Sequence, residues 1–383
     1  MYNIKTLNKI AAVGLGALPR DSFTVDADAP ADAVLVRSAS MHGQPLPPSL
    51  LCVARAGAGV NNIPVELCSE QGVVVFNTPG ANANAVKELT LCALLLASRD
   101  IAGGLAWAAT LKGKGAEVPA LVEKGKGAFA GPELYKKTLG VVGLGATGAL
   151  VANAALALGM KVIGHDPYLS VESAWRVDRH IENCPDYKSV FERGDYITLH
   201  APATAETKGL ICAAAIAQMK DGVRLINIAR GDLVNETDLL AALASGKVAR
   251  YVTDFPGDAL LGEKNVVALP HLGASTPESE DNCAVMACEQ VKNYLLYGAV
   301  KNSVNLPDID QPLASGHRLC VLHRNIPNML GTVSSALAAE GINIENMVSK
   351  SKKDYAYTVL DIDGHPAAPI KAEGIIRVRH LKI

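Results

Sequence analysis

The chain lacks the features typical of nucleic-acid-binding, membrane-spanning and secreted proteins. Its 36 Lys and Arg residues nearly balance its 38 Asp and Glu residues, so no net basic charge is available to hold nucleic acid or an anionic membrane. The longest apolar run, residues 89–97, is far shorter than the roughly 20 residues that cross a bilayer. Residues 1–10 contain no uninterrupted apolar segment followed by a cleavage site, so we expect no secretory signal.

Cysteine is poorly placed for disulfide or zinc chemistry. The eight cysteines are scattered, mostly within apolar runs, and neither a Cys-x-x-Cys pair nor a metal-like histidine spacing occurs. We therefore expect reduced thiols in core positions, no metal, and a cytoplasmic protein. Aromatic residues make up only 4% of the chain, whereas hydrophobic residues make up 49% and glycine occurs 34 times. This composition is typical of a compact α/β protein with small, closely packed side chains.

At 383 residues the chain is long enough for two or three domains. Short runs rich in Val and Ile alternate with Gly, Pro and Asn clusters and with helix-like stretches, which predicts parallel sheets. We expect strands of a first unit at residues 33–36, 51–54 and 73–76, and of a larger second unit at residues 139–142, 161–164, 196–200, 224–228 and 266–269.

The last quarter of the chain has a different pattern. Helical spacing over residues 277–298 is followed by a polar, proline-containing stretch, which we interpret as a linker over residues 304–316. Beyond it we expect a small α+β module, with strands at residues 317–323, 342–349, 355–361 and 375–380 and a helix at residues 328–340.

The most informative motif is a G-x-G-x-x-G turn at Gly143, Gly145 and Gly148, between an apolar strand and a helical run. In this setting the glycines allow a tight turn, close approach of a pyrophosphate and close helix packing. An acid is expected about 20 residues later to bind ribose hydroxyls, and Asp166 follows the next strand. We therefore predict a Rossmann-type domain that prefers NAD to NADP. An ordinary tight turn is the alternative. A similar run at residues 13–18 lacks the third glycine, and we assign it to a loop.

Three further motifs, residues 227–231, 254–258 and 270–276, each follow an expected strand, where an open parallel sheet places its active site. They supply Arg230, a cation that can bind a substrate carboxylate, and His271, which can act as general acid/base. They also include carboxylates that could orient the histidine.

Together with the glycine turn, these motifs resemble the D-isomer-specific 2-hydroxyacid dehydrogenases over about residues 30–305. The resemblance implies that Arg230 binds the substrate carboxylate and carbonyl oxygen, that His271 is the general acid/base, and that Asp254 approaches the nicotinamide carboxamide. The family usually has a Glu a few residues after that Asp. This chain has Asp258 there, which we take as the partner of His271, with Glu263 as the alternative.

The resemblance also places His200 in the nicotinamide pocket, although this residue could simply cap the turn. Further cofactor contacts are expected at Ala146, Thr147, Ala201, Pro202, Ala229 and Gly273.

The first unit contains segments that resemble the phosphoglycerate dehydrogenase group of this family, at residues 36–40, 53–63 and 77–82. Guanidinium forks and backbone N–H groups suit a substrate that carries carboxylate and phosphate. The glycines could instead serve only a tight turn. The expected substrate contacts are Arg37, Ser38, Arg55, Ala56, Gly57 and Asn82.

The C-terminal module resembles an ACT domain, which binds amino acids in biosynthetic enzymes. The resemblance implies L-serine as an effector, contacted by His323, Asn325 and Asn343. The chain departs from the family where Asn328 replaces a usual Gly and where Pro366 and Pro369 interrupt the second helix. The module could therefore serve only dimerisation.

These observations predict a doubly wound, Rossmann-type NAD domain (residues 86–274) inserted in a flavodoxin-like substrate domain (residues 1–85 and 275–303), with an ACT-like domain over residues 317–383. The resemblance implies NAD-dependent oxidation of a small phosphorylated 2-hydroxy acid, 3-phosphoglycerate, by a homodimer or homotetramer. A glyoxylate or hydroxypyruvate reductase, a D-lactate-type dehydrogenase and an NAD-sensing corepressor-like protein are the alternatives. Domain closure is expected to use hinges near Asn84 and Ser275.

Overall fold

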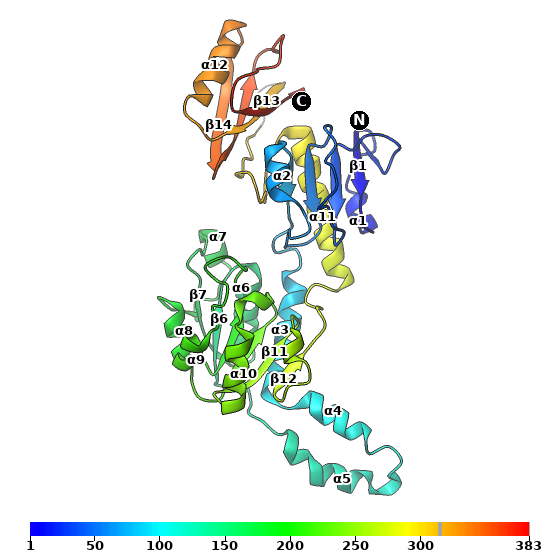
Figure 1. Ribbon diagram of the computed structural model, residues 1–383, viewed down its shortest axis with the longest axis vertical. Helices are drawn as coiled ribbons and strands as arrows, with labels where there is room; N and C mark the ends of the chain where they lie inside the picture. Colours follow the sequence, from blue (N-terminus) through cyan, green and yellow to red (C-terminus); the bar gives the residue numbers. More distant parts are fainter. Residues whose placement is uncertain (313–315, 383) are drawn as a thin grey trace. The chain divides into compact units, whose positions relative to one another are not determined.

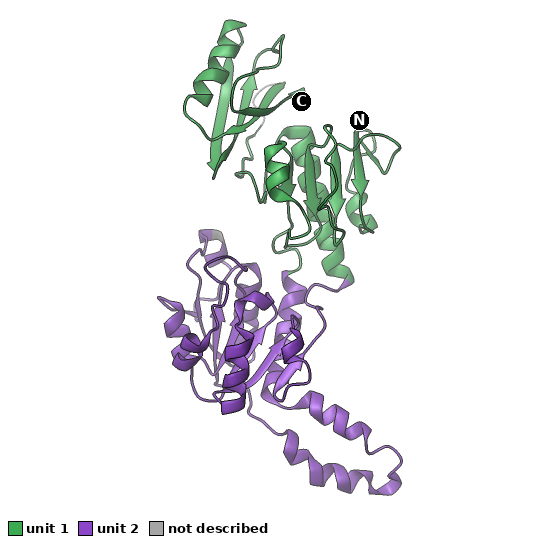
Figure 2. Ribbon diagram, in the orientation of Figure 1, with its two compact units in different colours: residues 1–82, 277–383 green, residues 83–276 purple. Residues whose placement is uncertain are grey.

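The computed structural model describes residues 1–312 and 316–382, and it divides into two compact units (Figure 2). Unit 1 combines residues 1–82 with residues 277–383, and unit 2 comprises residues 83–276. Residues 313–315 of the expected linker and residue 383 of the expected module lie outside the described residues. The N-terminal segment and the helix after residue 276 thus belong to the same unit.

The first sheet of unit 1 is parallel and has the strand order β2-β1-β3-β4-β5, the flavodoxin-like order. Val- and Ile-rich runs form its buried central strands, as the sequence predicts. The strands are β1 (Tyr2–Thr6), β2 (Phe23–Val25), β3 (Ala33–Val36), β4 (Cys52–Arg55) and β5 (Val74–Phe76), and the helices are α1 (Ala12–Leu15), α2 (Val65–Glu70) and α11 (Pro277–Tyr297).

Helix α1 corrects one expectation, because the glycine-containing run at residues 13–18 is partly helical rather than a loop. A Cβ on Gly14 would strike the backbone of Ala284 in α11, so this glycine allows two helices to touch. The second glycine motif therefore serves packing within unit 1.

Unit 2 contains a parallel sheet with the order β12-β11-β10-β9-β6-β7-β8, which is the doubly wound Rossmann order with one strand added. Its strands are β6 (Thr138–Val142), β7 (Lys161–His165), β8 (Glu182–Asn183), β9 (Tyr196–Leu199), β10 (Val223–Asn227), β11 (Val248–Thr253) and β12 (Val266–Ala268). Its helices are α3 (Ala83–Ser98), α6 (Ala146–Ala157), α7 (Val171–Ala174), α8 (Tyr187–Arg193), α9 (Ala213–Gln218) and α10 (Glu236–Ser245), with 3-10 turns η3 (Gly231–Leu233) and η4 (Asp258–Leu260). The predicted fold class is confirmed.

A helical arm projects from this sheet (Figure 1). It consists of α4 (Ile101–Ala109), η1 (Gly115–Glu117), α5 (Val118–Gly125) and η2 (Lys126–Phe129). No residue of α4 or α5 is buried, although α4 is rich in apolar side chains. No single helix among the described residues is long and apolar enough to span a membrane; α3 and α4 meet that test only as a pair bent by 72°.

The C-terminal module is an antiparallel sheet of order β14-β15-β13-β16 with one face against helix α12. Its elements are β13 (His317–Arg324), α12 (Met329–Ala339), β14 (Ile344–Lys352), β15 (Tyr355–Ile362) and β16 (Ile375–Lys382). Residues 363–374, where the expected second helix carries two prolines, form no helix. Proline lacks the N–H that a helix interior needs.

The module packs onto the rest of unit 1. The hydroxyl of Tyr357 donates to the carbonyl of Gly298 over 2.8 Å, and Arg379 donates to the carbonyls of Tyr294 and Leu295 at 3.2 and 2.9 Å. The Leu295 carbonyl lies in the last turn of α11, where carbonyls have no partner within the helix, and Gly298 directly follows that helix. The opposite sheet face to α12 therefore shares a hydrophobic core with α11 and the parallel sheet.

The described part of the expected linker is packed into this core. Leu306 and Ile309 are buried, and Asn305 accepts from the N–H of Val75 over 2.9 Å and donates to the carbonyl of Val73 over 2.9 Å. Residues 304–312 thus act as part of unit 1, although their polar and proline content predicts an exposed linker. Within this segment, the Asn305 side chain has partners inside the protein on both its oxygen and its nitrogen.

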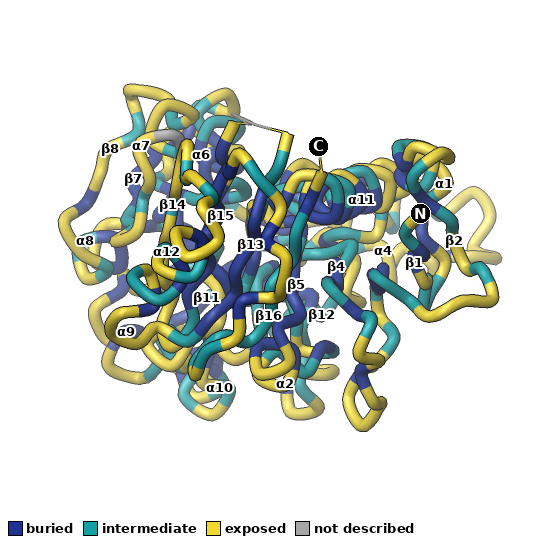
Figure 3. The backbone as a smooth tube through the Cα atoms, turned by 90° about the horizontal axis from the view of Figure 1, so that it is seen from above, coloured by how far each residue is buried: buried dark blue, intermediate teal, exposed yellow. Residues whose placement is uncertain are grey.

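Burial follows the sheets, with exposed residues on the loops and outer helix faces (Figure 3). The eight cysteines, all in the described part of the chain, are free thiols. Six are buried, whereas Cys92 is exposed and Cys212 is half-buried, so the expectation of core positions is wrong for these two.

Candidate active site

A glycine-rich turn joins β6 to α6. Gly143 has a φ of +91°, a conformation that favours glycine, and a Cβ on Gly148 would strike the Gly143 carbonyl. Among the described atoms beyond its chain neighbours, none lies within 4 Å of the Cβ position of Gly145. The N–H groups of Ala146 and Thr147 begin a 12-residue helix and have no partner within it. The turn is therefore suited to an anion.

Asp166 follows β7 and is bonded to this turn. Its Oδ2 accepts from the N–H of Leu144 over 2.9 Å, and its Oδ1 accepts from the N–H of Tyr168 over 2.9 Å. The glycine turn and the carboxylate therefore lie side by side, as a dinucleotide site requires.

His200, directly after β9, packs against the same turn. Its N–H donates to the carbonyl of Val142 over 2.7 Å, and its Nε2 shares a hydrogen bond of 3.0 Å with Thr198 Oγ1. Burial lowers the pKa of His200 to about 4, so the ring is neutral at physiological pH. The next residue, Ala201, is buried and Pro202 is exposed.

The loop that carries Arg230 is shaped by Asn227, the last residue of β10. The Asn227 Oδ1 accepts from the N–H groups of Ala229 and Arg230 at 3.1 and 3.3 Å, and its Nδ2 donates to the carbonyl of Arg230 over 2.8 Å. Arg230 Nη1 donates to the carbonyl of Ala229 over 2.6 Å. The guanidinium is half-buried at the carboxyl edge of the sheet, where the sequence predicts it.

Asp254, directly after β11, is a buried carboxylate. Its Oδ2 accepts from the N–H of Gly273 over 3.0 Å, whereas its Oδ1 is buried and has no hydrogen-bond partner among the described residues. Burial raises the pKa of Asp254. An unpartnered buried acceptor is costly unless a bound donor satisfies it.

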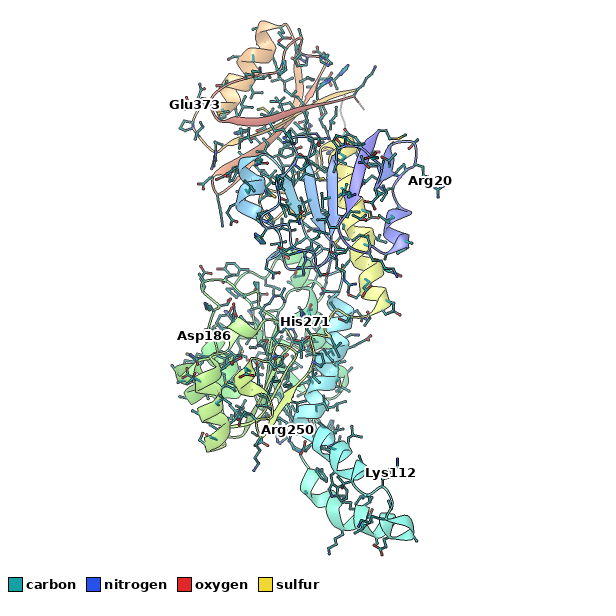
Figure 4. The ribbon with its side chains drawn as sticks, turned by 45° about the vertical axis from the view of Figure 1, so that its right-hand side comes forward. Arg20, Lys112, Asp186, Arg250, His271 and Glu373 are labelled. Atoms are coloured by element: carbon teal, nitrogen blue, oxygen red, sulfur yellow. The ribbon has the colours of Figure 1, made fainter. Side chains whose placement is uncertain are left out.

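His271 follows β12, and its side chain is exposed (Figure 4). Its ring lies against Phe255, with centroids 4.2 Å apart and an interplanar angle of 48°. The Arg230 guanidinium lies 5.8 Å from the centroid of the same Phe255 ring. The structure therefore brings Arg230 and His271 to one aromatic side chain that sequence reasoning missed.

The acid partner of His271 is not evident from contacts. Asp258 is exposed at the start of η4, and in residues 1–312 and 316–382 no hydrogen bond or ion pair joins it or Glu263 to His271. Glu236 instead accepts from the N–H of Gly257 over 3.1 Å and supports this segment. The pairing of Asp258 with His271 stays a prediction. No local motif marks Glu236.

In unit 1, two asparagines clamp residues 37–39. The Asn8 Oδ1 accepts from the N–H groups of Arg37, Ser38 and Ala39 at 3.2, 3.0 and 2.8 Å. The Asn62 Nδ2 donates to the carbonyls of Arg37 and Ala39 at 3.3 and 2.8 Å. The loop after β3 is thus held in one conformation by two side chains that sequence reasoning did not single out.

Arg37 and Arg55 leave the ends of neighbouring strands. The Arg55 Nε donates to the carbonyl of Arg37 over 2.9 Å, and Nη1 bonds the carbonyl of Gly59. Arg37 Nη2 lies 2.7 Å from Glu280 Oε1, and both side chains are about two-fifths exposed. Two arginines therefore stand at the same edge of the sheet, at the ends of β3 and β4.

The other expected substrate contacts border this edge. The N–H of Ala56 donates to the carbonyl of Val36 over 2.8 Å, and the N–H of Gly57 donates to that of Arg55 over 2.9 Å. Asn82 is the last residue of the N-terminal segment of unit 1.

The C-terminal module contains a cavity of about 330 Å³ that His323 and Asn325 line together with Asn328 and Lys350. His323 is buried, and its Nε2 shares a hydrogen bond of 2.9 Å with Thr358 Oγ1. Asn328 has a φ of +66°, which asparagine tolerates in place of the family's usual glycine. Asn343, the third expected effector contact, is not among the residues that line this cavity. Its N–H donates to Asp363 Oδ1 over 2.8 Å.

Comparison with known proteins assigns the second unit. Residues 94–273 match the model of the D-isomer specific 2-hydroxyacid dehydrogenase, NAD binding domain. These residues form an NAD-binding domain of that family. Two features of this domain suit NAD. There is space beside Gly145 at the N-terminus of α6, where a diphosphate can bind, and the buried Oδ1 of Asp254 has no hydrogen-bond donor among the described residues.

Curated relatives are similar over more than this domain. A D-3-phosphoglycerate dehydrogenase of Synechocystis sp. is 33% identical over 89% of this chain and 60% of its own length. One of Bacillus subtilis is 39% identical over 72% of this chain and 52% of its own. The chain thus spans about half to three-fifths of the curated relatives it matches. An NAD+-bound 3-phosphoglycerate dehydrogenase structure from Entamoeba histolytica has a TM-score of 0.61 at 26% identity, over 79% of this chain and 98% of that one.

Within the described residues, no group of three or more His, Cys, Asp or Glu side chains is arranged to hold a metal ion.

Proposed function

We propose that this protein is a D-3-phosphoglycerate dehydrogenase, which oxidises 3-phosphoglycerate to 3-phosphohydroxypyruvate with NAD in the first step of L-serine biosynthesis. The observation that carries the proposal is that Arg37 and Arg55 leave the ends of neighbouring strands, where the Arg55 Nε donates to the backbone carbonyl of Arg37. Arg37 is paired with the Glu280 carboxylate over 2.7 Å, so a bound phosphate would compete with that carboxylate for the guanidinium. A phosphorylated hydroxy acid supplies that phosphate, and the names of the curated relatives agree with it.

The residues of unit 2 suit the oxidation step. NAD, when bound, supplies the hydride acceptor; we assign its diphosphate to the turn at Gly143 to Gly148, its ribose to Asp166 and its carboxamide to Asp254. Neutral His271 takes the proton of the substrate hydroxyl at a ring nitrogen. Arg230 binds the substrate carboxylate and stabilises negative charge on the reacting oxygen.

The first experiment follows NADH absorbance with purified protein offered 3-phosphohydroxypyruvate, hydroxypyruvate, pyruvate and glyoxylate in parallel. We expect kcat/KM to be highest for the phosphorylated keto acid. Higher kcat/KM for hydroxypyruvate, glyoxylate or pyruvate would instead identify a reductase or D-lactate-type enzyme. A protein that binds NADH but turns over none of the four would favour a corepressor-like role.

The phosphate assignment is tested separately with Arg37→Gln and Arg55→Gln. Loss of one charge-assisted hydrogen bond, about 1.5–3 kcal/mol, lowers kcat/KM for the phosphorylated substrate by roughly 10- to 150-fold. Arg20→Gln is the matched control, because Arg20 is exposed in the same unit (Figure 4). An equal loss with hydroxypyruvate and with its phosphorylated analogue would contradict the assignment.

We further propose that the C-terminal module binds L-serine. The support is the cavity beside Asn325, which has room for a small polar molecule and is lined by amide and ammonium groups. We expect L-serine to inhibit NADH oxidation in the same assay, and Asn325→Ala to weaken that inhibition. If the module serves only dimerisation, the parent protein and Asn325→Ala will both be insensitive to L-serine.

Assembly and location complete the proposal. The arm of unit 2 exposes apolar side chains, including Ile101 at 40% and Leu105 at 69% exposure, and such a surface is typical of a subunit interface. We therefore expect a homodimer or homotetramer, which sedimentation of the parent and of Leu105→Glu distinguishes from a monomer. The free thiols suit a reducing, cytoplasmic compartment.

A further inference from the structure

Phe255 occupies the position between the two polar groups assigned to chemistry. It follows the buried Asp254 where β11 ends, and its N–H donates to Thr253 Oγ1 over 3.0 Å. A Cβ on Gly231 would lie 3.5 Å from the Phe255 Cβ, which is ordinary contact distance. The backbone of Phe255 is therefore held by the strand end and faced by the loop that follows Arg230.

The ring of Phe255 contacts both groups. The His271 ring lies 4.2 Å from it, centroid to centroid, and the Arg230 guanidinium carbon lies 5.8 Å from its centroid. Aromatic rings prefer tilted or offset contacts at such distances, and a guanidinium is attracted to a ring face. The Phe255 side chain, which has a flat ring and only two rotatable bonds, thus adjoins both His271 and Arg230.

His271 has little else to orient it. Among the described residues its side chain takes part in no hydrogen bond and no ion pair, and it is exposed. An imidazole that must accept a proton from a substrate needs a defined direction, which a carboxylate bonded to its other nitrogen normally supplies. Among the described residues, the Phe255 ring packs against the imidazole and restricts it, and the Asp254 carboxylate interacts with it electrostatically.

We propose that Phe255 is a positioning residue of the active site, which fixes the direction of His271 and its relation to Arg230 by ring packing. The inference rests on the proposed function and adds to it a residue that holds the acid/base group without touching the proton. A small displacement of such a group costs about 100-fold in rate.

The test compares Phe255→Leu and Phe255→Tyr with the parent protein. Leucine keeps apolar bulk and loses the flat ring, so we expect kcat to fall about 10- to 100-fold, with a smaller rise in KM for the keto acid. Tyrosine keeps the ring and should restore kcat to within about threefold. The affinity for NADH, measured by fluorescence, should be unchanged in both variants.

Phe129→Leu is the matched control. Phe129 is also half-buried in unit 2 and also packs against an aromatic ring, that of Trp107, with centroids 5.3 Å apart. We expect it to keep the parent kcat. Parallel losses of NADH affinity, melting temperature and kcat in Phe255→Leu would reveal a merely structural role and overturn the inference.

The two proposals fail differently. If the parent reduces an unphosphorylated keto acid best, the substrate assignment falls and Phe255 is tested on that acid. If the parent is active and Phe255→Leu keeps kcat within twofold, the positioning inference falls and the function stands. A parent that reduces none of the four keto acids overturns both.

Discussion

The buried ion pair between Arg318 and Asp361 makes a quantitative prediction about unit 1. The side chains are 1% and 0% exposed, with Nε to Oδ1 at 2.7 Å and Nη2 to Oδ2 at 3.1 Å. Arg318 also donates to the carbonyls of Tyr297 and Pro312, at 3.0 and 2.9 Å. The pair therefore links β13 and β15 to the end of α11 and the chain segment that follows it.

The substitution Asp361→Asn keeps the shape and removes the charge. Arg318 is then left as a buried cation without its carboxylate, at a cost of about 3–5 kcal/mol in the free energy of unfolding. For a unit of this size, about 2–4 °C of melting temperature corresponds to each kcal/mol, so we expect a drop of roughly 6–20 °C.

Glu182→Gln is the control. Glu182 pairs with Arg193 over 2.6 Å, but the side chains are 56% and 46% exposed, so we expect solvent screening to keep the loss of stability far smaller than in Asp361→Asn. Scanning calorimetry of both variants measures the two losses, with unit 1 as the transition that shifts in Asp361→Asn.

A double variant sharpens the result. Arg318→Met combined with Asp361→Leu removes both charges together, and we expect it to regain most of the stability lost by Asp361→Asn. Equal melting temperatures for Asp361→Asn and Glu182→Gln would refute the argument from burial. A double variant as unstable as the single one would show that the hydrogen bonds to the carbonyls, rather than the unpaired charge, dominate.

Two further predictions concern unit 2. Burial lowers the pKa of His200 from 6.5 to about 4. Between pH 6.5 and pH 4 the His200 ring is therefore protonated in the unfolded chain but not in the folded one. The stability that the folded protein has above pH 6.5 is consequently lost in part as the pH falls toward 4. His200→Gln should flatten the dependence of the unit 2 melting temperature on pH over this range; an unchanged slope would contradict it. Gly148→Ala places a methyl group against the Gly143 carbonyl, so we expect NADH affinity to fall at least about tenfold by fluorescence titration, whereas Gly127→Ala, which has open space, should keep it.

Periodicity and turn chemistry predicted most of the architecture. The runs at residues 33–36 and 139–142 became buried strands because they are short, apolar and rich in Val, as the sequence pattern predicted. The glycine turn was recognisable because it depends on short-range structure. Gly143 and Gly148 lie at the junction of β6 and α6, and Asp166 follows β7, the next strand along the chain.

The features that the sequence did not predict depend on contacts between residues far apart in the chain. Asn8 binds the loop at Arg37 from 29 residues away, and Phe255 and His271 are separated in sequence by β12. Residues 304–312 have the composition of a linker, but Asn305 is bonded to Val75 and Val73, which lie 230 and 232 positions earlier in the chain. Local propensity contains no information about such partners.

The two-part origin of unit 1 has a consequence for how the protein is made. Residues 1–82 leave the ribosome before α11, which packs against β4 through Val291 and Tyr294 and is translated roughly 200 residues later. Unit 2 is continuous and can fold during that interval. Until α11 has been synthesised, the apolar face of the N-terminal sheet that α11 covers in the folded unit stays exposed, and exposed apolar surface of this kind favours aggregation.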